Sequence, residues 1–304
     1  MTKTTAMKAN NTKICEYTRG IAANLKQLGR IGTAMKYENA MRSFSQFLTD
    51  GDIRIKDMTP SLIENYEGWL RSRQCCRNTT SYYIRTVRAV YNRAVRDGIA
   101  EKRELFSDVF TGVAKTEKRA LTIDAIRRIK TVPLQHPGEK LARDMFMMSF
   151  YLRGMSFVDM AFLRKTDLSH GRVTYTRRKT GQRLSIKWTD AMQDILNRHA
   201  TNPTEYLLPL LTRAEGDRYK EYLSMSERIN RALKPIGMML DLPIRLTMYC
   251  ARHSWATAAR TSGIPISVIS EGLGHDSEAT TQIYLASLDT VAVDNANDTI
   301  LAAV

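Results

Sequence analysis

Apolar residues recur at helical spacing along most of the chain, and this periodicity constrains the fold more than any other feature of the sequence. In residues 12–48 the residues with this spacing are Ile21, Leu25, Leu28, Met41, Phe44 and Phe47. We expect a helix over this stretch, a second after Pro60, and another from near Asn78, a suitable N-cap, to Gly98. The N-terminal region is thus predicted to be a small helical bundle.

The period changes once, in the segment GRVTYTRRKTGQRLSIKW at residues 171–188. Its side chains alternate around a central Lys-Thr-Gly, a pattern typical of a β-hairpin with Gly181 in the turn. Residues 141–163 before it indicate two helices separated by a turn at Gly154, and the pattern from Thr189 to about Leu285 is again helical. The predicted fold is mainly α, with an N-terminal bundle followed by an α+β domain that contains a small antiparallel hairpin.

A polar stretch near residues 111–118 lacks apolar periodicity and is interpreted as a linker. The expected organisation is an N-terminal domain over 1–112, a linker over 113–118 and a second domain over 119–304. A chain of 304 residues is long enough for two separate cores.

The net charge of +15 indicates a polyanionic partner, although charge alone does not separate DNA from RNA or anionic lipid. Residues 1–118 carry 21 Lys and Arg against 12 Asp and Glu, and the remainder carries 25 against 19, so both halves are basic. The four cysteines have neither disulfide-framework nor zinc-ligand spacing. With no membrane span and no secretory signal in the sequence, we expect a cytoplasmic protein with reduced thiols.

Seven arginines lie between Glu67 and Asp97 with no acidic residue among them. They are Arg71, Arg73, Arg77, Arg85, Arg88, Arg93 and Arg96. Most charge runs are solvated helix faces, but such faces usually alternate in sign, so contact with a DNA backbone is the favoured interpretation. The hydroxyls of residues 79–83 stand beside these arginines and are candidates for neutral phosphate contacts.

Three short segments carry candidate chemistry: RRKTGQ at 177–182, YCARHSWATAA at 249–259, and ISEGLGHDSEATTQIYLASL at 269–288. Each is weak alone, because an Arg-His pair or a tyrosine on an apolar helix is more often structural. In this order they resemble the tyrosine recombinase (phage integrase) family. The family's motifs correspond here to Arg252-His253 with Thr257, to Leu273-Gly274-His275, and to Tyr284 nine residues after that histidine.

The resemblance extends over nearly the whole chain, so that residues 12–110 resemble the family's SAM-like core-binding domain and residues 119–304 its catalytic domain. It implies that Tyr284 is the nucleophile of a site-specific DNA recombinase, forming a 3′-phosphotyrosyl intermediate. Arg252 and His275 would stabilise the charge that builds up on the phosphate, and Lys179 would protonate the leaving oxygen. His253 is expected to support Arg252. No cofactor and no metal are expected, because the phosphotyrosine stores the bond energy for rejoining.

The sequence departs from the family pattern at two positions. Ser156 stands where the family has an arginine, and we hypothesise that Arg153 replaces that charge, the alternative being a surface arginine whose neighbour Ser156 merely caps a helix. Tyr249 stands where a histidine is usual, and a phenol cannot carry imidazole's positive charge. Both departures resemble a subgroup of mobile-element integrases and DNA invertases of anaerobic gut bacteria.

The implied partners are double-stranded DNA with paired recombination sites and further copies of the chain, assembled as a tetramer through the C-terminal tail. An accessory DNA-bending factor is a further partner that the resemblance allows, and no membrane partner is expected. Alternative functions are a catalytically impaired, DNA-binding regulatory relative and an enzyme like the type IB topoisomerases. A metal-dependent nuclease is disfavoured, because no paired carboxylate motif suits two-metal catalysis.

Overall fold

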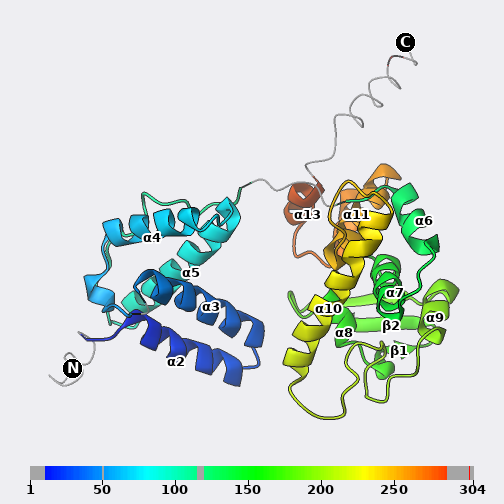
Figure 1. The fold of residues 1–304 in the computed structure, drawn as a ribbon, viewed down its shortest axis with the longest axis horizontal. Helices are drawn as coiled ribbons and strands as arrows, with labels where there is room; N and C mark the ends of the chain where they lie inside the picture. The colour runs from blue at the N-terminus through cyan, green and yellow to red at the C-terminus, as the bar shows by residue number, and fades with distance from the viewer. Residues whose placement is uncertain (1–10, 50, 115–119, 286–300, 302–304) are drawn as a thin grey trace. The chain divides into compact units, whose positions relative to one another are not determined.

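The computed structural model describes residues 11–49, 51–114, 120–285 and 301, although not the side chains of Ile283 and Tyr284. The chain divides into two compact units, Met1–Thr116 and Glu117–Val304. Both are mainly helical (Figure 1). No helix in the described parts of the chain has the length and apolar character needed to cross a membrane.

Four α-helices and one 3-10 turn build the described part of the first unit. They are α2 (Ile14–Gln27), α3 (Ile31–Phe47), η1 (Ile55–Asp57), α4 (Pro60–Ser72) and α5 (Arg77–Arg96). The helices enclose an apolar core whose largest fully buried side chains include Phe44, Tyr66 and Tyr91. The predicted helical bundle is confirmed.

Two boundaries in this unit differ from the prediction. The stretch 12–48 is two helices, because Gly29 has φ +70 and ends the first one in a left-handed turn. Helix α5 begins at Arg77 with Cys76 as its N-cap. The side chain of Asn78, the expected cap, instead hydrogen-bonds both backbone groups of Ala114.

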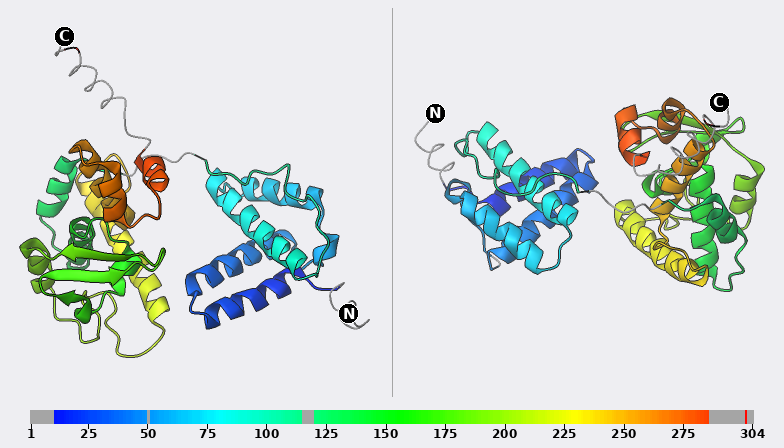
Figure 2. Two further views of the ribbon diagram at one scale, coloured as in Figure 1. Left: turned by 180° about the vertical axis from the view of Figure 1, so that it is seen from behind. Right: turned by 90° about the horizontal axis from the view of Figure 1, so that it is seen from above.

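In the second unit several helices pack against α7, and the unit also contains a three-stranded antiparallel sheet (Figure 2). Its helices are α6 (Ile123–Thr131), α7 (Pro137–Tyr151), α8 (Phe157–Ala161), η2 (Lys165–Asp167), α9 (Asp190–Asn197), α10 (Arg218–Met239), α11 (Met248–Thr261), α12 (Ile266–Leu273) and α13 (Glu278–Leu285). Its strands are β1 (Leu168–Ser169), β2 (Arg172–Thr176) and β3 (Arg183–Lys187), in the order β1-β2-β3.

The β2–β3 hairpin is the one predicted from the alternation. Val173 pairs with Ile186 and Tyr175 with Leu184, and these four inward-facing side chains are buried in the core. Gly181 lies in the turn with φ +76, a conformation that glycine adopts without strain. The predicted fold class, mainly α with a small antiparallel sheet, is therefore confirmed.

The expectation of continuous helix after Thr189 was wrong in part. Residues 198–217 form loops and turns, and residues 240–247 separate α10 from α11. The buried amide of Asn202 holds the first loop by donating to the carbonyls of Leu208 and Leu211 at 2.7 and 3.1 Å. This pairing lets an apolar, non-helical segment enter the core without leaving buried carbonyls unsatisfied.

A buried carboxylate joins the C-terminal end of α9 to α7. Asp144 is 2% exposed and contacts Arg143 at 3.0 Å, Arg198 at 2.9 Å and His199 at 3.1 Å. Burial alone would raise the pKa of Asp144, but the hydrogen bond with His199 and the two arginine charges outweigh it and lower the pKa. This network stabilises the unit away from the candidate site described next.

Candidate active site

Arg252 is the centre of the candidate site. It lies on α11 and is only 5% exposed, yet its guanidinium donates to the carbonyl of Gly154 at 2.9 Å and to that of Leu273 at 2.6 Å. Both carbonyls belong to chain turns, one following α7 and the other ending α12. A buried guanidinium requires such acceptors, because an unpaired buried charge is strongly unfavourable.

The turn at Gly154 requires glycine. Its φ is +70, and a Cβ added there would lie 2.6 Å from the Cα of Arg252. The turn and α11 therefore approach each other closely enough for the carbonyl of Gly154 to accept a hydrogen bond from the guanidinium of Arg252.

His275 contacts Arg252 directly. Its Nε2 lies 3.1 Å from Nη2 of Arg252, and its Nδ1 lies 2.8 Å from Oγ1 of Thr281. Burial and the positive charges of Arg252, Arg177 and Lys179 lower the pKa of His275 to about 4. The imidazole is therefore neutral at physiological pH.

The hairpin turn brings two further basic residues to this cluster. Arg177 is 7% exposed, and its guanidinium donates to the carbonyl of Gly274. Gly274 has φ +64, and a Cβ there would lie 2.8 Å from the Leu184 side chain, so the two turns are packed tightly together. Lys179, at the exposed tip, is close enough for its charge to lower the pKa of His275.

Arg177 was not among the predicted site residues. One signal could have found it, because strand alternation places residue 177 on the same face as the buried Val173 and Tyr175.

Ser156 occupies the position where an arginine was expected, and it caps α8. Its Oγ donates to the Asp159 carboxylate at 2.7 Å and accepts from the Asp159 backbone N–H at 3.4 Å, so its predicted role as an N-cap is confirmed. The other carboxylate oxygen of Asp159 accepts from the Arg178 N–H at 2.9 Å. Asp159, which sequence reasoning did not name, thereby fixes the start of the hairpin turn to α8.

Arg153 lies directly before the glycine whose carbonyl holds Arg252. It has φ +57, an uncommon conformation for a residue with a Cβ and one that costs free energy. Its half-buried side chain lies beside Gly272, with Cδ 3.8 Å from where a Cβ of that glycine would stand. Among the described residues, none forms a hydrogen bond or ion pair with its guanidinium.

The pKa of the buried Tyr175 phenol is affected by several of these charges, which shows that they lie close together. Burial raises the pKa of Tyr175, and the Asp159 carboxylate raises it further. The charges of Arg252, Arg177 and Arg153 oppose this rise. The positive charges of three arginines, which come from three different turns or helices, thus all influence the Tyr175 hydroxyl.

Two predicted tyrosines are placed less completely. Tyr284 belongs to α13, one residue before its end, and its side chain lies outside the described part of the chain. Tyr249 is 49% exposed, and its ring packs edge-on against His253 with centroids 4.5 Å apart. The contact described for His253 is therefore with Tyr249, and its expected support of Arg252 remains a prediction.

The seven arginines of the first unit do not share one face. Arg71 pairs with Glu67 at 2.7 Å, Arg93 lies 3.9 Å from Asp97, Arg77 lies over the Phe110 ring, and Arg88 donates to Thr111. Arg73 and Arg85 instead line two hollows, and Arg96 is exposed. The acidic residues that flank the arginine run thus pair with two of its members.

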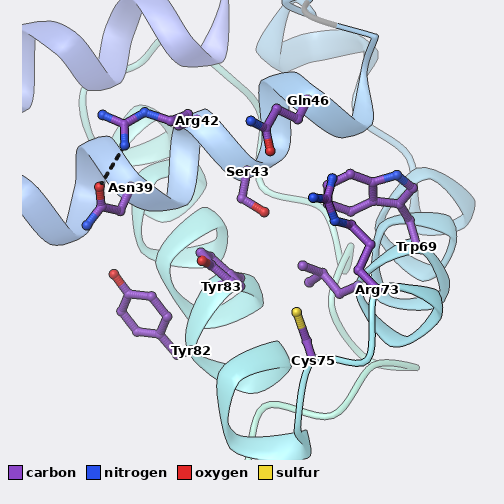
Figure 3. Close-up of a pocket in the computed structure, with 10 residues that line it drawn as sticks. Asn39, Arg42, Ser43, Gln46, Trp69, Arg73, Cys75, Tyr82 and Tyr83 are labelled. Carbon is purple, nitrogen blue, oxygen red and sulfur yellow. Dashed lines mark hydrogen bonds between the residues drawn. The ribbon is translucent and has the colours of Figure 1, made fainter. Parts of the chain in front are cut away.

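The larger hollow, of about 440 Å³, lies between α3, α4 and α5 (Figure 3). Arg42, Asn39 and Gln46 of α3 line one side, and Arg73 lies over the Trp69 ring on the other, 4.8 Å from its centroid. A neighbouring hollow of about 240 Å³ is lined in part by Lys36, Tyr82 and Arg85, and Tyr82 borders both. The polar residues of α3 were missed, because they are spread one per turn and form no charge run.

The cysteines Cys15, Cys75, Cys76 and Cys250 are free thiols, as expected. Within residues 11–49, 51–114 and 120–285, no three His, Cys, Asp or Glu side chains gather in a way that could hold a metal ion.

Comparison with known proteins matches each of the two units to a protein-family model. The family model for the phage integrase SAM-like domain matches residues 13–107, and the model for the phage integrase family matches residues 120–290. A tyrosine recombinase of Pseudothermotoga lettingae is 25% identical over 274 residues, covering 87% of this chain and 91% of the relative. Tyrosine recombinase XerC of Rickettsia bellii is 24% identical over 268 residues, covering 83% and 85%.

Solved structures share the fold. A lambda integrase (75-356) dimer bound to a COC' core site aligns with a TM-score of 0.68 at 16% identity, covering 90% of this chain and 95% of the other. The Tn1549 transposon integrase in complex with circular intermediate DNA aligns with a TM-score of 0.65 at 16% identity, covering 94% and 99%.

Fold and matches together define the class of this chain as a site-specific recombinase. The chain belongs to the phage integrase family, the tyrosine recombinases.

Proposed function

We propose that this recombinase cleaves and rejoins DNA strands through a 3′-phosphotyrosyl intermediate on Tyr284. The observation that carries the proposal is the contact between Arg252, His275 and Thr281, which joins a buried cationic centre to the helix that bears Tyr284. An in-line displacement at phosphorus needs such a centre, because negative charge builds up on the non-bridging oxygens in the transition state.

In the proposed reaction the phenolic oxygen of Tyr284 attacks the scissile phosphorus and the bond from phosphorus to the 5′ oxygen breaks. The phenol releases its proton to solvent as the new bond forms, and Lys179 donates a proton to the leaving oxygen. The exposed position of Lys179 on a hairpin turn suits contact with bound DNA. Rejoining reverses these steps with a new 5′ hydroxyl as the attacking group.

His275 acts mainly by positioning Arg252 in this proposal. Its lowered pKa favours the neutral ring, and a neutral Nε2 facing the guanidinium serves as an acceptor. The guanidinium of Arg252 also donates one hydrogen bond to the carbonyl of Gly154 and one to that of Leu273, and these two bonds hold it in one orientation.

We propose further that Arg153 supplies the positive charge absent at Ser156. Its strained backbone, its place next to Gly154 and its effect on Tyr175 all support this role. Arg177 is a second source of positive charge at the site, but its guanidinium already donates to the carbonyl of Gly274, whereas no described residue forms a hydrogen bond or ion pair with the guanidinium of Arg153. An Arg153→Ala protein should lose cleavage activity, and undiminished cleavage would exclude the role.

Tyr249 is proposed to contact a DNA phosphate through its hydroxyl, since half of its side chain is exposed. A Tyr249→Phe protein, which retains the packing on His253, should then bind DNA more weakly. Unchanged binding would reduce Tyr249 to a packing role.

DNA binding is assigned to both units. Residues 1–112 are proposed as the core-binding domain, with the hollows between α3, α4 and α5 facing DNA, and residues 119–304 as the catalytic domain joined by the linker 113–118. Lys36, Arg42, Arg73 and Arg85 line these hollows and are the preferred phosphate contacts. Contact of the other arginines between Arg71 and Arg96 with the DNA backbone remains a prediction.

One solved relative is a lambda integrase tetramer bound to a Holliday junction, and this supports assembly of four copies on two paired DNA sites. The C-terminal tail, proposed to link neighbouring copies, lies almost entirely outside the described residues. An accessory DNA-bending factor would act with this assembly.

A nicked suicide substrate carrying the recombination site tests the proposal. The parent protein should form a gel-stable covalent adduct, and Tyr284→Phe should form none. Tyr219→Phe on α10 is the matched control, since it removes a hydroxyl from a tyrosine packed against Tyr222. An adduct of equal yield in Tyr284→Phe would refute the assignment of the nucleophile.

The second candidate, a catalytically impaired regulatory relative, is favoured by one observation, namely the serine at the arginine position. It predicts site-specific DNA binding without any adduct in the parent protein. The same assay, read beside a binding measurement, therefore separates the two functions.

A further inference from the structure

The helix that carries Tyr284 is joined to the basic cluster through Thr281. Oγ1 of Thr281 lies 2.8 Å from Nδ1 of His275, and the residue is 0% exposed. Thr281 precedes Tyr284 by three residues, within one turn of α13. A contact at Thr281 therefore bears directly on where the backbone of Tyr284 lies.

The donors in this chain of contacts can be assigned from chemistry. A guanidinium has only donors, so the Nε2 of His275 that faces Nη2 of Arg252 must accept. In a neutral ring the single proton then resides on Nδ1, which donates to Oγ1 of Thr281. Arg252, His275 and Thr281 thus form one directed series of hydrogen bonds.

A second anchor holds α13 on its apolar side. Leu285 is buried with Ala256, Ile269 and Leu273 of α11 and α12. Thr281 and Leu285 are four residues apart and lie on the same side of the helix. The polar anchor and the apolar anchor together place α13 against α11 and α12.

We infer that Thr281 is a positioning residue that holds His275 as the Nδ1–H tautomer and couples that state to the docking of the nucleophile helix. The inference rests on the proposed function of the site. It adds Thr281 to the residues of the site and makes the state of His275 depend on the docking of α13. When α13 is docked, Nε2 of His275 accepts from Arg252 while Nδ1–H donates to Thr281. When α13 leaves, Nδ1–H loses this acceptor, and the contact with Arg252 is left to favour the tautomer without it.

The functional consequence is a link between two parts of the reaction. The orientation of Arg252 for phosphate depends partly on His275, and His275 depends on Thr281. The cationic centre is thus fully ordered only when the helix bearing Tyr284 is in place. Such coupling limits phosphate activation to protomers whose nucleophile is available.

The adjacent threonine offers a matched control. Thr280 is exposed, and its described contacts are local ones to Ser277. A Thr280→Val change therefore alters the same helix by the same chemistry without touching His275. Thr281→Ser restores the hydroxyl that Thr281→Val removes.

The first experiment measures the tautomer in the full-length protein without DNA. Nitrogen chemical shifts of ¹⁵N-labelled histidines separate the two neutral tautomers, and a His275→Asn protein assigns His275 among the five histidines. The parent, Thr280→Val and Thr281→Ser should show the Nδ1–H form. Thr281→Val should shift the His275 nitrogens toward the Nε2–H form or an average.

The second experiment measures single-turnover cleavage of the suicide substrate. Thr281→Val should slow cleavage roughly 5- to 150-fold, the range for removing one partner of a hydrogen bond and leaving the other unsatisfied. Thr281→Ser should restore most of the rate, and Thr280→Val should leave it unchanged. A thermal melt of each variant separates this loss from unfolding.

Unchanged His275 nitrogen shifts in folded Thr281→Val would overturn the inference, and so would a cleavage rate within about twofold of the parent. The outcomes also distinguish this inference from the proposed function. If the parent formed no adduct, the function would fail, while the shifts would still decide whether Thr281 sets the tautomer.

Discussion

Gly154→Ala should destabilise the catalytic unit and misplace Arg252. The residue is buried and has φ +70, which alone costs an L residue about 1 kcal/mol. The added Cβ would lie 2.6 Å from Cα, 2.9 Å from Cγ and 3.0 Å from Cβ of Arg252. Because a backbone atom cannot rotate away, the overpacking cost of about 1–3 kcal/mol adds to the first. The expected loss of unfolding free energy is about 2–4 kcal/mol.

Gly171→Ala is the control for this change. Its φ of +68 is nearly the same, but nothing lies within 4 Å of the Cβ that it would gain. It should therefore cost only about 1 kcal/mol, the backbone part of the penalty. Both glycines belong to the unit Glu117–Val304, so both substitutions act on the same unfolding transition in urea.

The difference between the two variants isolates the contact with Arg252. We expect Gly154→Ala to be less stable than Gly171→Ala by about 1–3 kcal/mol, and to lose adduct formation on the suicide substrate. Equal stabilities within about 0.5 kcal/mol, with normal cleavage by Gly154→Ala, would refute the claim that the close approach positions Arg252.

Three further predictions follow from the structure. Arg73→Ala and Arg85→Ala should each weaken DNA binding and reduce the salt slope by about 1, measured by fluorescence anisotropy across a salt series, whereas Arg71→Ala, whose charge is already paired, should do so less. Asp159→Asn should lower unfolding free energy by about 1–3 kcal/mol in urea, because it weakens two partly buried hydrogen bonds, and cleavage should fall with it. The pKa of Asp144 is lowered in the folded protein, so its contribution to stability is present above its unfolded pKa of about 3.9 and is lost as the pH falls below that value. In a pH series of thermal melts, Asp144→Asn should therefore reduce the loss of stability that the parent protein shows at acidic pH.

The parts of the fold that were predicted from sequence are those set by local pattern. Alternation around Gly181 gave the hairpin and its turn, and the serine before α8 gave the cap. Where a single polar side chain overrode the apolar pattern, the prediction failed. The apolar segment near Leu208 enters the core as a loop, because the amide of Asn202 satisfies carbonyls six and nine residues further along the chain, which helical periodicity does not reveal.

The candidate site could be predicted only as a set of residue types. The resemblance supplied Arg252 and His275, which the structure brings to 3.1 Å. It could not supply Arg177 or Thr281, because their importance arises from which backbone or side-chain atom each one meets after folding. The arginine run likewise predicted only how many positive charges this region carries. Which of these arginines face outward depends on helix geometry and on neighbouring acidic residues.

The way in which the buried arginines are held explains why this site suits an anion. Arg252 and Arg177 direct donors to backbone carbonyls, which satisfy hydrogen bonds without cancelling charge as a carboxylate would. The nearby carboxylate of Asp159 is occupied by Ser156 and the hairpin backbone. Burial and the positive charges of Arg252, Arg177 and Lys179 together lower the pKa of His275 to about 4. A phosphodiester bound here would oppose the part of that shift that comes from the charges, so substrate itself would change the proton affinity of the histidine that positions Arg252.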